Sequence, residues 1–105
     1  MSTSPKTSPT KTRVVLRIQL HEGMGDQYAA AYDLVHHDIA KADGYISSQL
    51  CKSVKDPDCW IVTSEWASME QYLAFVASEE FTARRAGMRK CVLEHDSSQY
   101  SVVAE

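Results

Sequence analysis

Residues that could hold and activate an aromatic molecule lie close together between Cys59 and Met88. The first part of this stretch, Cys59–Trp66, is rich in β-branched and aromatic residues and follows a Lys-Asp-Pro-Asp turn, which predicts a strand. Arg85 follows on a segment with helical periodicity, and we expect it to face the same way as the strand's aromatic side chains. Side chains alternate along a strand, which puts four residues on one face: Trp60, Val62, Ser64 and Trp66.

The chemistry that this set suggests is oxygenation without a cofactor. A guanidinium in an apolar cavity keeps its charge, so Arg85 would favour a bound phenolate or enolate. Dioxygen reacts slowly with neutral closed-shell carbon, whereas an electron-rich anion can transfer an electron to it. Tyr72 would hydrogen-bond a substrate oxygen. The predicted cavity is apolar and flat-walled, and its lining is Trp60, Trp66, Met69, Tyr72 and Phe75.

His36 is a further candidate, because it could deprotonate a phenol at neutral pH. On a helical wheel it lies at the edge of the apolar stripe, whereas His37 points nearly opposite, to solvent. The two histidines do not share a face, so we expect no metal site built on both. Sequence motifs for a catalytic triad, a phosphate-binding loop or a zinc protease are absent from the chain.

Each candidate also has a purely structural interpretation. Two tryptophans on one strand face occur more often in a core than in a ligand wall, and Tyr72 could equally be a packing residue. Arg85 could be neutralised by an acidic neighbour, for which the chain offers Glu65, Asp33 and Asp38.

The elements that would position these residues follow the order β-α-β-β-α-β. Asp26 is the expected N-cap of the first helix, Gly44 closes its C-terminal end, and Ser68 with Gln71 forms a capping box for the second helix. This order predicts an α+β, ferredoxin-like fold with an antiparallel sheet and helices on one face. The expected strands are Arg13–His21, Tyr45–Val54, Cys59–Trp66 and Gln99–Ala104, and the helices run from Asp26 to about Lys41 and from Ser68 to about Val92.

Composition limits the range of functions. The chain has 105 residues, a net charge of −3 and 44% hydrophobic residues, which fits one globular domain over 13–105 behind a disordered, Ser/Thr/Pro/Lys-rich tail over 1–12. No concentrated basic surface is expected, so nucleic-acid binding is disfavoured. No apolar run approaches the ~20 residues of a membrane span.

Three cysteines, Cys51, Cys59 and Cys91, lack metal-ligand spacing and are interpreted as reduced thiols. Met1–Thr12 has no apolar core of the kind a signal peptide needs, so a reducing cytoplasm is expected. Whether Cys51 and Cys59 approach each other across the predicted hairpin stays open.

The first and third strands carry apolar residues on both faces. Val15 opposes Leu16, and Ile61 opposes Val62. One face can take the helices, while the other needs a partner. A second copy of the sheet is the simplest partner, so we predict a homodimer whose sheets face each other.

Residues 13–104 resemble the antibiotic-biosynthesis monooxygenase family of dimeric α+β barrels. The resemblance is carried by Asp43-Gly44-Tyr45 at the second strand, by Glu65-Trp66 with the following Ala-Ser-Met-Glu-Gln-Tyr, and by Phe75 and Glu80-Phe81. It implies small-molecule chemistry in a pocket between sheet and helices.

Within that family the chain is most similar to anthrone monooxygenases, which use no flavin, metal or haem and bind a flat polycyclic phenol. Trp66 and Tyr72 match their pattern, and Arg85 matches within one residue, with Arg84 as the neighbouring option. Val62 stands where the pattern has an asparagine, and Ser64 on the same face could partly substitute. The haem-degrading members are disfavoured, because their asparagine, tryptophan and histidine correspond here to Leu16, Phe75 and Arg85.

The sequence therefore predicts a cofactor-independent monooxygenase that uses dioxygen to oxidise an aromatic, anthrone-like polyketide intermediate. Arg85, Tyr72, Trp66 and His36 are the predicted catalytic residues. The alternatives are a polyketide cyclase or isomerase on the same scaffold without oxygen consumption, and a non-catalytic small-molecule-binding domain. The predicted substrate-binding residues are Trp60, Val62, Ser64, Met69 and Phe75, with no metal ligand among them.

Overall fold

A computed structural model describes residues 10–105, apart from the side chain of Glu80. The predicted order of elements is confirmed, and the turn signal at Ser78-Glu79-Glu80 divides the second helical region into two helices. No helix in this part of the chain is long and apolar enough to cross a membrane. The elements are β1 (Thr12–Leu20), α1 (Gly25–Ile39), β2 (Tyr45–Lys52), β3 (Cys59–Trp66), α2 (Met69–Val76), α3 (Glu79–Arg89) and β4 (Val92–Ser101).

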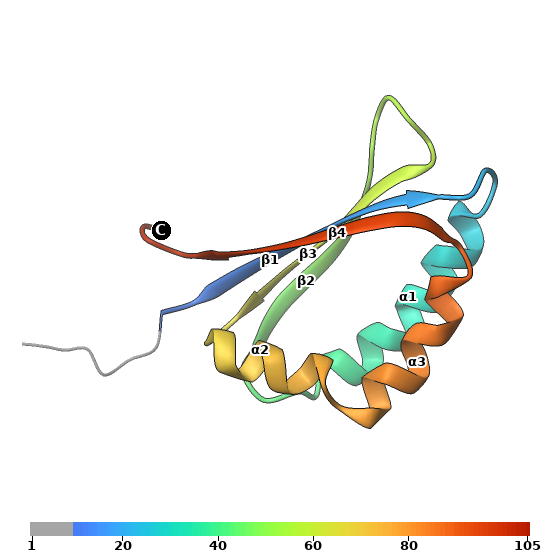
Figure 1. Ribbon diagram of the computed structural model, residues 1–105. Coiled ribbons are helices and arrows are strands. Elements are labelled where there is room, and N and C mark those ends of the chain that lie inside the picture. Colours follow the sequence, from blue (N-terminus) through green and yellow to red (C-terminus); the bar gives the residue numbers. More distant parts are fainter. Residues whose placement is uncertain (1–9) are drawn as a thin grey trace, which may run out of the picture.

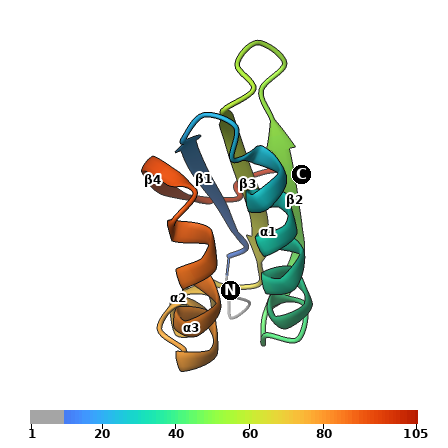
Figure 2. The same cartoon turned by 90° about the vertical axis from the view of Figure 1, so that its right-hand side faces the viewer.

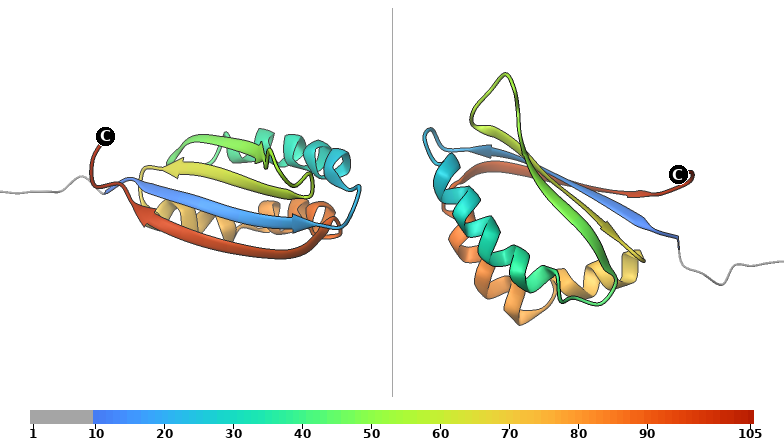
Figure 3. Two further views of the ribbon diagram at one scale, coloured as in Figure 1. Left: turned by 90° about the horizontal axis from the view of Figure 1, so that it is seen from above. Right: turned by 180° about the vertical axis from the view of Figure 1, so that it is seen from behind.

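The strands form one antiparallel sheet in the order β2-β3-β1-β4, which confirms the ferredoxin-like fold. All three helices lie on one face of the sheet, and the β2–β3 loop rises away from them (Figure 1). Seen end-on, α1 lies beside α3, with α1 on the β2 side and α3 on the β4 side (Figure 2). The opposite face carries no helix (Figure 3).

The hydrophobic core lies between the central strands and α1. Val14, Ile18 and Leu20 on β1 are buried, because alternation points them at the helices. Ile18 and Leu20 cluster with Tyr28 of α1 and with Cys91 just before β4. This core confirms the apolar face predicted for the first strand.

Helix ends follow the predicted caps in part. Ser68 accepts a hydrogen bond from the Gln71 amide at 3.2 Å, which confirms the cap of α2. Asp26 does not cap α1: the helix begins one residue earlier, after Met24, which makes no side-chain cap. Gly44 has a φ of +87°, the left-handed conformation expected of a turn glycine, but it lies beyond the end of α1 at Ile39.

The fourth strand was predicted too late and too short. It spans Val92–Ser101, whereas the sequence indicated a helix to about Val92 and a strand over Gln99–Ala104. β4 is an edge strand that pairs with β1, and most of its side chains are exposed. Such a strand needs no alternating apolar residues, so its sequence, VLEHDSSQYS, gives no strand pattern.

Positions 1–9 of the predicted tail lie outside the described residues, so the disordered tail stays a prediction. β1 begins at Thr12, which is buried, one residue before the predicted start. The Lys11 carbonyl accepts from the Val102 amide at 2.9 Å, and the Lys11 ammonium lies 3.0 Å from Glu105 Oε1. The residue before β1 is therefore joined to the segment after β4.

Candidate functional site

A pocket of about 440 Å³ opens to solvent between α1 and β2. It includes His36, the predicted base, together with two hydroxyl-bearing residues that the sequence had not marked, Tyr32 and Ser48. Of the predicted site residues within the described chain, His36 is the one that lines it. The full lining is Tyr32, Asp33, His36, Ser48, Gln49, Leu50 and Cys51.

A chain of hydrogen bonds runs from this pocket to His36. Tyr32 Oη lies 2.8 Å from Ser48 Oγ, which lies 3.2 Å from Tyr45 Oη. Tyr45 Oη lies 3.3 Å from His36 Nε2. All four side chains are partly buried, and burial raises the pKa of Tyr32, so its phenol stays protonated at neutral pH. The predicted orientations are confirmed, because His36 is half-buried while His37 is exposed.

Trp66 lies at the centre of a cluster of aromatic rings. Its side chain is 0% exposed. Its ring centroid lies 5.8 Å from Tyr45 of β2, 5.6 Å from Tyr72 and 5.4 Å from Phe75, both of α2. Phe81 of α3 extends the cluster at 4.7 Å from Phe75. Trp66 is therefore enclosed by its own neighbours, and it supports the pocket through Tyr45 without lining it.

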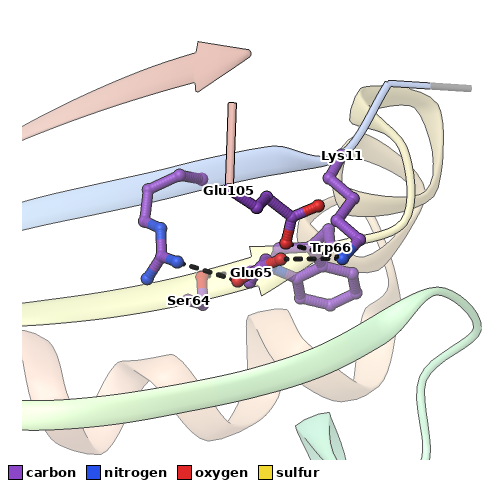
Figure 4. Close-up of polar contacts among 6 residues, drawn as sticks. Lys11, Ser64, Glu65, Trp66 and Glu105 are labelled. Atoms are coloured by element: carbon purple, nitrogen blue, oxygen red, sulfur yellow. Dashed lines mark hydrogen bonds and ion pairs between the residues drawn. The ribbon is translucent and has the colours of Figure 1, made fainter. Parts of the chain in front are cut away.

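Ser64 satisfies the one polar group of this tryptophan. Trp66 Nε1 donates to Ser64 Oγ at 3.0 Å, and both residues are buried on the helix side of β3. The intervening Glu65 faces the other side of the sheet, where it pairs with Arg13 at 2.8 Å and with Lys11 at 3.6 Å (Figure 4). Ser64 is thus engaged within the cluster.

The two adjacent arginines of α3 have different partners. Arg84 Nε lies 2.9 Å from Asp38 Oδ2 on α1, so Arg84 is the one in an ion pair. Arg85 stacks on Phe81, its guanidinium carbon 5.3 Å from the ring centroid. Among the side chains that the structure describes, no carboxylate lies within ion-pair distance of Arg85. The cation predicted for anion binding thus borders the aromatic cluster.

The structure does not bring the remaining predicted residues to one place. Trp60 lies at the far end of β3 from Trp66, with its indole N–H donating to Pro57 O at 2.7 Å and its ring 6.2 Å from Tyr28. Val62 packs against the core cluster in mid-strand, opposite Leu16. Met69 is 37% exposed at the start of α2.

Tyr32, Tyr45 and Ser48 are the residues that the sequence prediction missed. Tyr32 belonged to the expected apolar stripe of the first helix, and Tyr45 was the first residue of the second strand. Three residues apart on a regular strand, Tyr45 and Ser48 would face opposite sides of the sheet; a register shift between Tyr45 and Ser47 puts both on the helix side, opposite Trp66 and Ser64. Their role depends on how α1 crosses β2, which no local pattern encodes.

The pocket contains one thiol, Cys51. Cys51, Cys59 and Cys91 are free, as predicted. Cys51 pairs with Ile61, so Cys59 is its diagonal neighbour on the sheet face without helices. Within residues 10–105 no group of His, Cys, Asp or Glu side chains could hold a metal ion.

This sheet, with its helix-covered aromatic cluster and adjoining pocket, forms a small ferredoxin-like α+β domain. The chain belongs to the antibiotic biosynthesis monooxygenase family, whose model matches residues 12–87. The family predicted from the sequence is therefore confirmed.

Curated relatives come from Streptomyces. The chain is 36% identical over 96 residues to the 42.8 kDa protein in the whiE locus of Streptomyces coelicolor, covering 91% of this chain and 24% of that protein. It is 34% identical to Protein SchA of Streptomyces halstedii, covering 91% of this chain and 25% of that protein. It is 32% identical to Polyketide synthase CurD of Streptomyces cyaneus, covering 100% of this chain and 29% of that protein. The chain spans about a quarter of the length of these relatives.

Solved structures share the fold at low sequence identity. SnoaB, a cofactor-independent oxygenase from Streptomyces nogalater, superposes with a TM-score of 0.84 at 11% identity, covering 91% of this chain and 96% of that one. A conserved protein from Methanosarcina mazei superposes with a TM-score of 0.81 at 16% identity, covering 88% of this chain and 92% of that one. These similarities establish the fold.

Proposed function

We propose that this protein is a cofactor-independent monooxygenase that oxidises an aromatic, anthrone-like polyketide intermediate. The observation that carries the proposal is the α1–β2 pocket, where hydroxyl groups and the imidazole of His36 meet beside the rings around Trp66. Its volume of about 440 Å³ suits a small polycyclic ligand. Membership of the family and the name of the relative CurD support an aromatic polyketide as the substrate class.

The reaction balances with dioxygen as the oxidant. Loss of a proton from the substrate gives an enolate or phenolate, which passes an electron to dioxygen and then couples with it to form a peroxide. Loss of water from the peroxide converts the methylene carbon to a carbonyl. One oxygen atom ends in the product and the other in water, so the substrate supplies every electron and no cofactor is required.

We assign the proton abstraction to His36. Arg85 borders the aromatic cluster on α3 and does not line the pocket, so it makes no contact with the anion in this proposal. Tyr72 and Phe75 hold Trp66, whose ring packs against Tyr45 beside the pocket. Trp60 and Val62 have no role in this proposal, since they lie in the core toward the other end of β3.

Oxygen uptake with dithranol, a dihydroxyanthrone, tests the proposal. We expect the purified chain to consume one dioxygen per dithranol, and His36→Gln to slow turnover about 100-fold because the base is lost. His37→Gln is the matched control, since His37 is exposed and its replacement should leave turnover within about twofold. Equal rates with and without the protein would refute the oxygenase assignment.

A polyketide cyclase or isomerase is the second candidate. The hydroxyl chain to His36 serves any reaction that begins with proton removal, whether or not dioxygen takes part. A cyclase would convert a reactive polyketide equally well under nitrogen. The anaerobic assay therefore separates the two candidates.

We also propose that two copies pair through the sheet face without helices. Val15 and Ile61 on that face are only half-buried within one chain, and the face is open in Figure 3. Sedimentation should give a dimer for the wild type and a monomer for Ile61→Lys. The exposed Leu34 on α1 provides the control Leu34→Lys, which should remain dimeric.

The free thiols support a location in a reducing compartment, for which we propose the cytoplasm. Cys51 and Cys59 lie on the same sheet face as diagonal neighbours and are not joined. Thiol titration of freshly lysed cells, with and without denaturant, should find all three cysteines reduced.

A further inference from the structure

We propose that Tyr32, Ser48 and Tyr45 form a proton relay, which carries the acidic proton of a phenolic or enolic ligand from the α1–β2 pocket to Nε2 of His36. The inference rests on the proposed function for the ligand class. It adds the path of the proton and the residue that meets the ligand. His36 lines the pocket together with Tyr32 and Ser48, but its Nε2 is bonded to Tyr45, which does not line the pocket, so the ligand's proton reaches Nε2 through the hydroxyl groups.

The hydrogen bonds allow two directions of donation, toward His36 or away from it, because every oxygen in the chain can donate or accept. The relay begins from the first: with the imidazole proton on Nδ1, Nε2 accepts from the Tyr45 hydroxyl at 3.3 Å. Tyr45 then accepts from Ser48 at 3.2 Å, and Ser48 accepts from Tyr32 at 2.8 Å. Every hydroxyl donates toward His36, so the Tyr32 oxygen has a lone pair left to accept a proton from a ligand.

Transfer of one proton along the chain is balanced at each step. The ligand O–H bond breaks as a new O–H bond forms to Tyr32 Oη. At the same time the original hydroxyl proton of Tyr32 passes to Ser48, that of Ser48 passes to Tyr45, and that of Tyr45 passes to His36 Nε2. The products are a ligand anion and an imidazolium. All donors now point the other way, and the Tyr32 hydroxyl donates to the new oxyanion, which stabilises it.

His36 lies in the last turn of α1, with other titratable groups around it. Those that line its pocket are Tyr32 and Asp33, both on α1, and Cys51 on β2. From α3, Arg84 is neutralised by Asp38.

Tyr45 is a positioning residue in this relay. Its ring lies edge-on to Trp66, with centroids 5.8 Å apart, and edge-on to His36 at 6.3 Å. These contacts hold the hydroxyl between Ser48 and His36. The buried aromatic cluster thus fixes the geometry of a chain that opens to solvent at Tyr32.

An anaerobic titration of the protein with dithranol tests the relay, because without oxygen the bound probe ionises but is not consumed. Binding is followed by tryptophan fluorescence and ionisation by the visible absorption of the dithranol anion across the neutral pH range. We expect Ser48→Ala and Tyr45→Phe to bind the probe while losing about tenfold or more of the anion. Ser48→Thr, which keeps the hydroxyl, should restore it. Tyr100→Phe, on an exposed part of β4, is the matched control.

The outcomes separate the relay from the proposed function. Wild-type ionisation in both Ser48→Ala and Tyr45→Phe would overturn the relay and leave the oxygenase proposal standing if oxygen uptake persists. Failure of the wild type to bind dithranol would overturn both. A loss of anion in Ser48→Ala that Ser48→Thr does not reverse would also count against the relay, because a hydroxyl is all that the link requires.

Discussion

The ring cluster around Trp66 and the pocket beside His36 are neighbours with opposite character. The cluster is closed, and the single N–H of Trp66 is satisfied by Ser64. The pocket is open, and its hydroxyl groups form a chain that ends on a titratable imidazole. Tyr45 belongs to both, through its ring and its hydroxyl. The comparison indicates that one region supplies rigidity and the other supplies the acid–base group.

The largest expected effect is on stability and comes from the cluster. Trp66→Ala should lower the free energy of unfolding by about 3–5 kcal/mol, because it empties the space that three rings enclose. Chemical denaturation measures it. His36→Gln, at the half-buried edge of the pocket, should change stability by less than about 1 kcal/mol while slowing turnover about 100-fold. A large loss of stability in His36→Gln together with a small one in Trp66→Ala would contradict the distinction between the two regions.

A smaller effect is expected from the two serines, one in each region. Ser64→Ala leaves the buried indole N–H of Trp66 without its acceptor and should cost about 1–3 kcal/mol of stability. Ser48→Ala removes a partly buried hydroxyl beside an open pocket, so its unfolding midpoint should move less. Equal midpoints for the two variants would contradict the difference in burial.

Alkaline unfolding should also report the closed interior. Burial raises the pKa of Tyr28 above its ordinary value of 10, so above that pH the unfolded chain loses the proton while the folded chain keeps it. Stability therefore falls as the pH rises past 10, by about 1.4 kcal/mol per pH unit for one such tyrosine. Tyr28→Phe should flatten the fall, whereas Tyr100→Phe, which is exposed, should not.

The smallest expected effect is at the start of α2, which carries Tyr72 and Phe75 to the cluster. Ser68→Ala removes the acceptor for the Gln71 amide and should cost about 1 kcal/mol. Near-ultraviolet circular dichroism should show looser aromatic packing, while the hydroxyl chain in the pocket is unaffected. A loss of dithranol ionisation in Ser68→Ala would show that the two regions are more tightly coupled than we infer.

Much of the fold was predictable because strong periodic patterns determine it. Residues Cys59–Trp66 form the strand expected from their alternation, and Ser68 caps its helix as its spacing to Gln71 indicated. β4 was misplaced, since a polar edge strand paired along one side has no pattern to detect. The family was predictable from the residues around Trp66, as the match over residues 12–87 confirms.

The candidate site was less predictable, because side chains far apart in sequence form it. The half-buried face of His36 was expected from the helical wheel, but its hydrogen bond to Tyr45 depends on how α1 crosses β2. The strand face shared by Trp60 and Trp66 was inferred correctly, yet five residues of strand lie between the two tryptophans. A common face therefore did not imply a common pocket.

The most direct test of the account is a crystal structure of the protein with dithranol bound under nitrogen. We predict the ligand in the α1–β2 pocket, with a ring hydroxyl within hydrogen-bond distance of Tyr32 Oη. A ligand bound elsewhere, or one in the pocket with its oxygens turned away from Tyr32 and Ser48, would contradict the account.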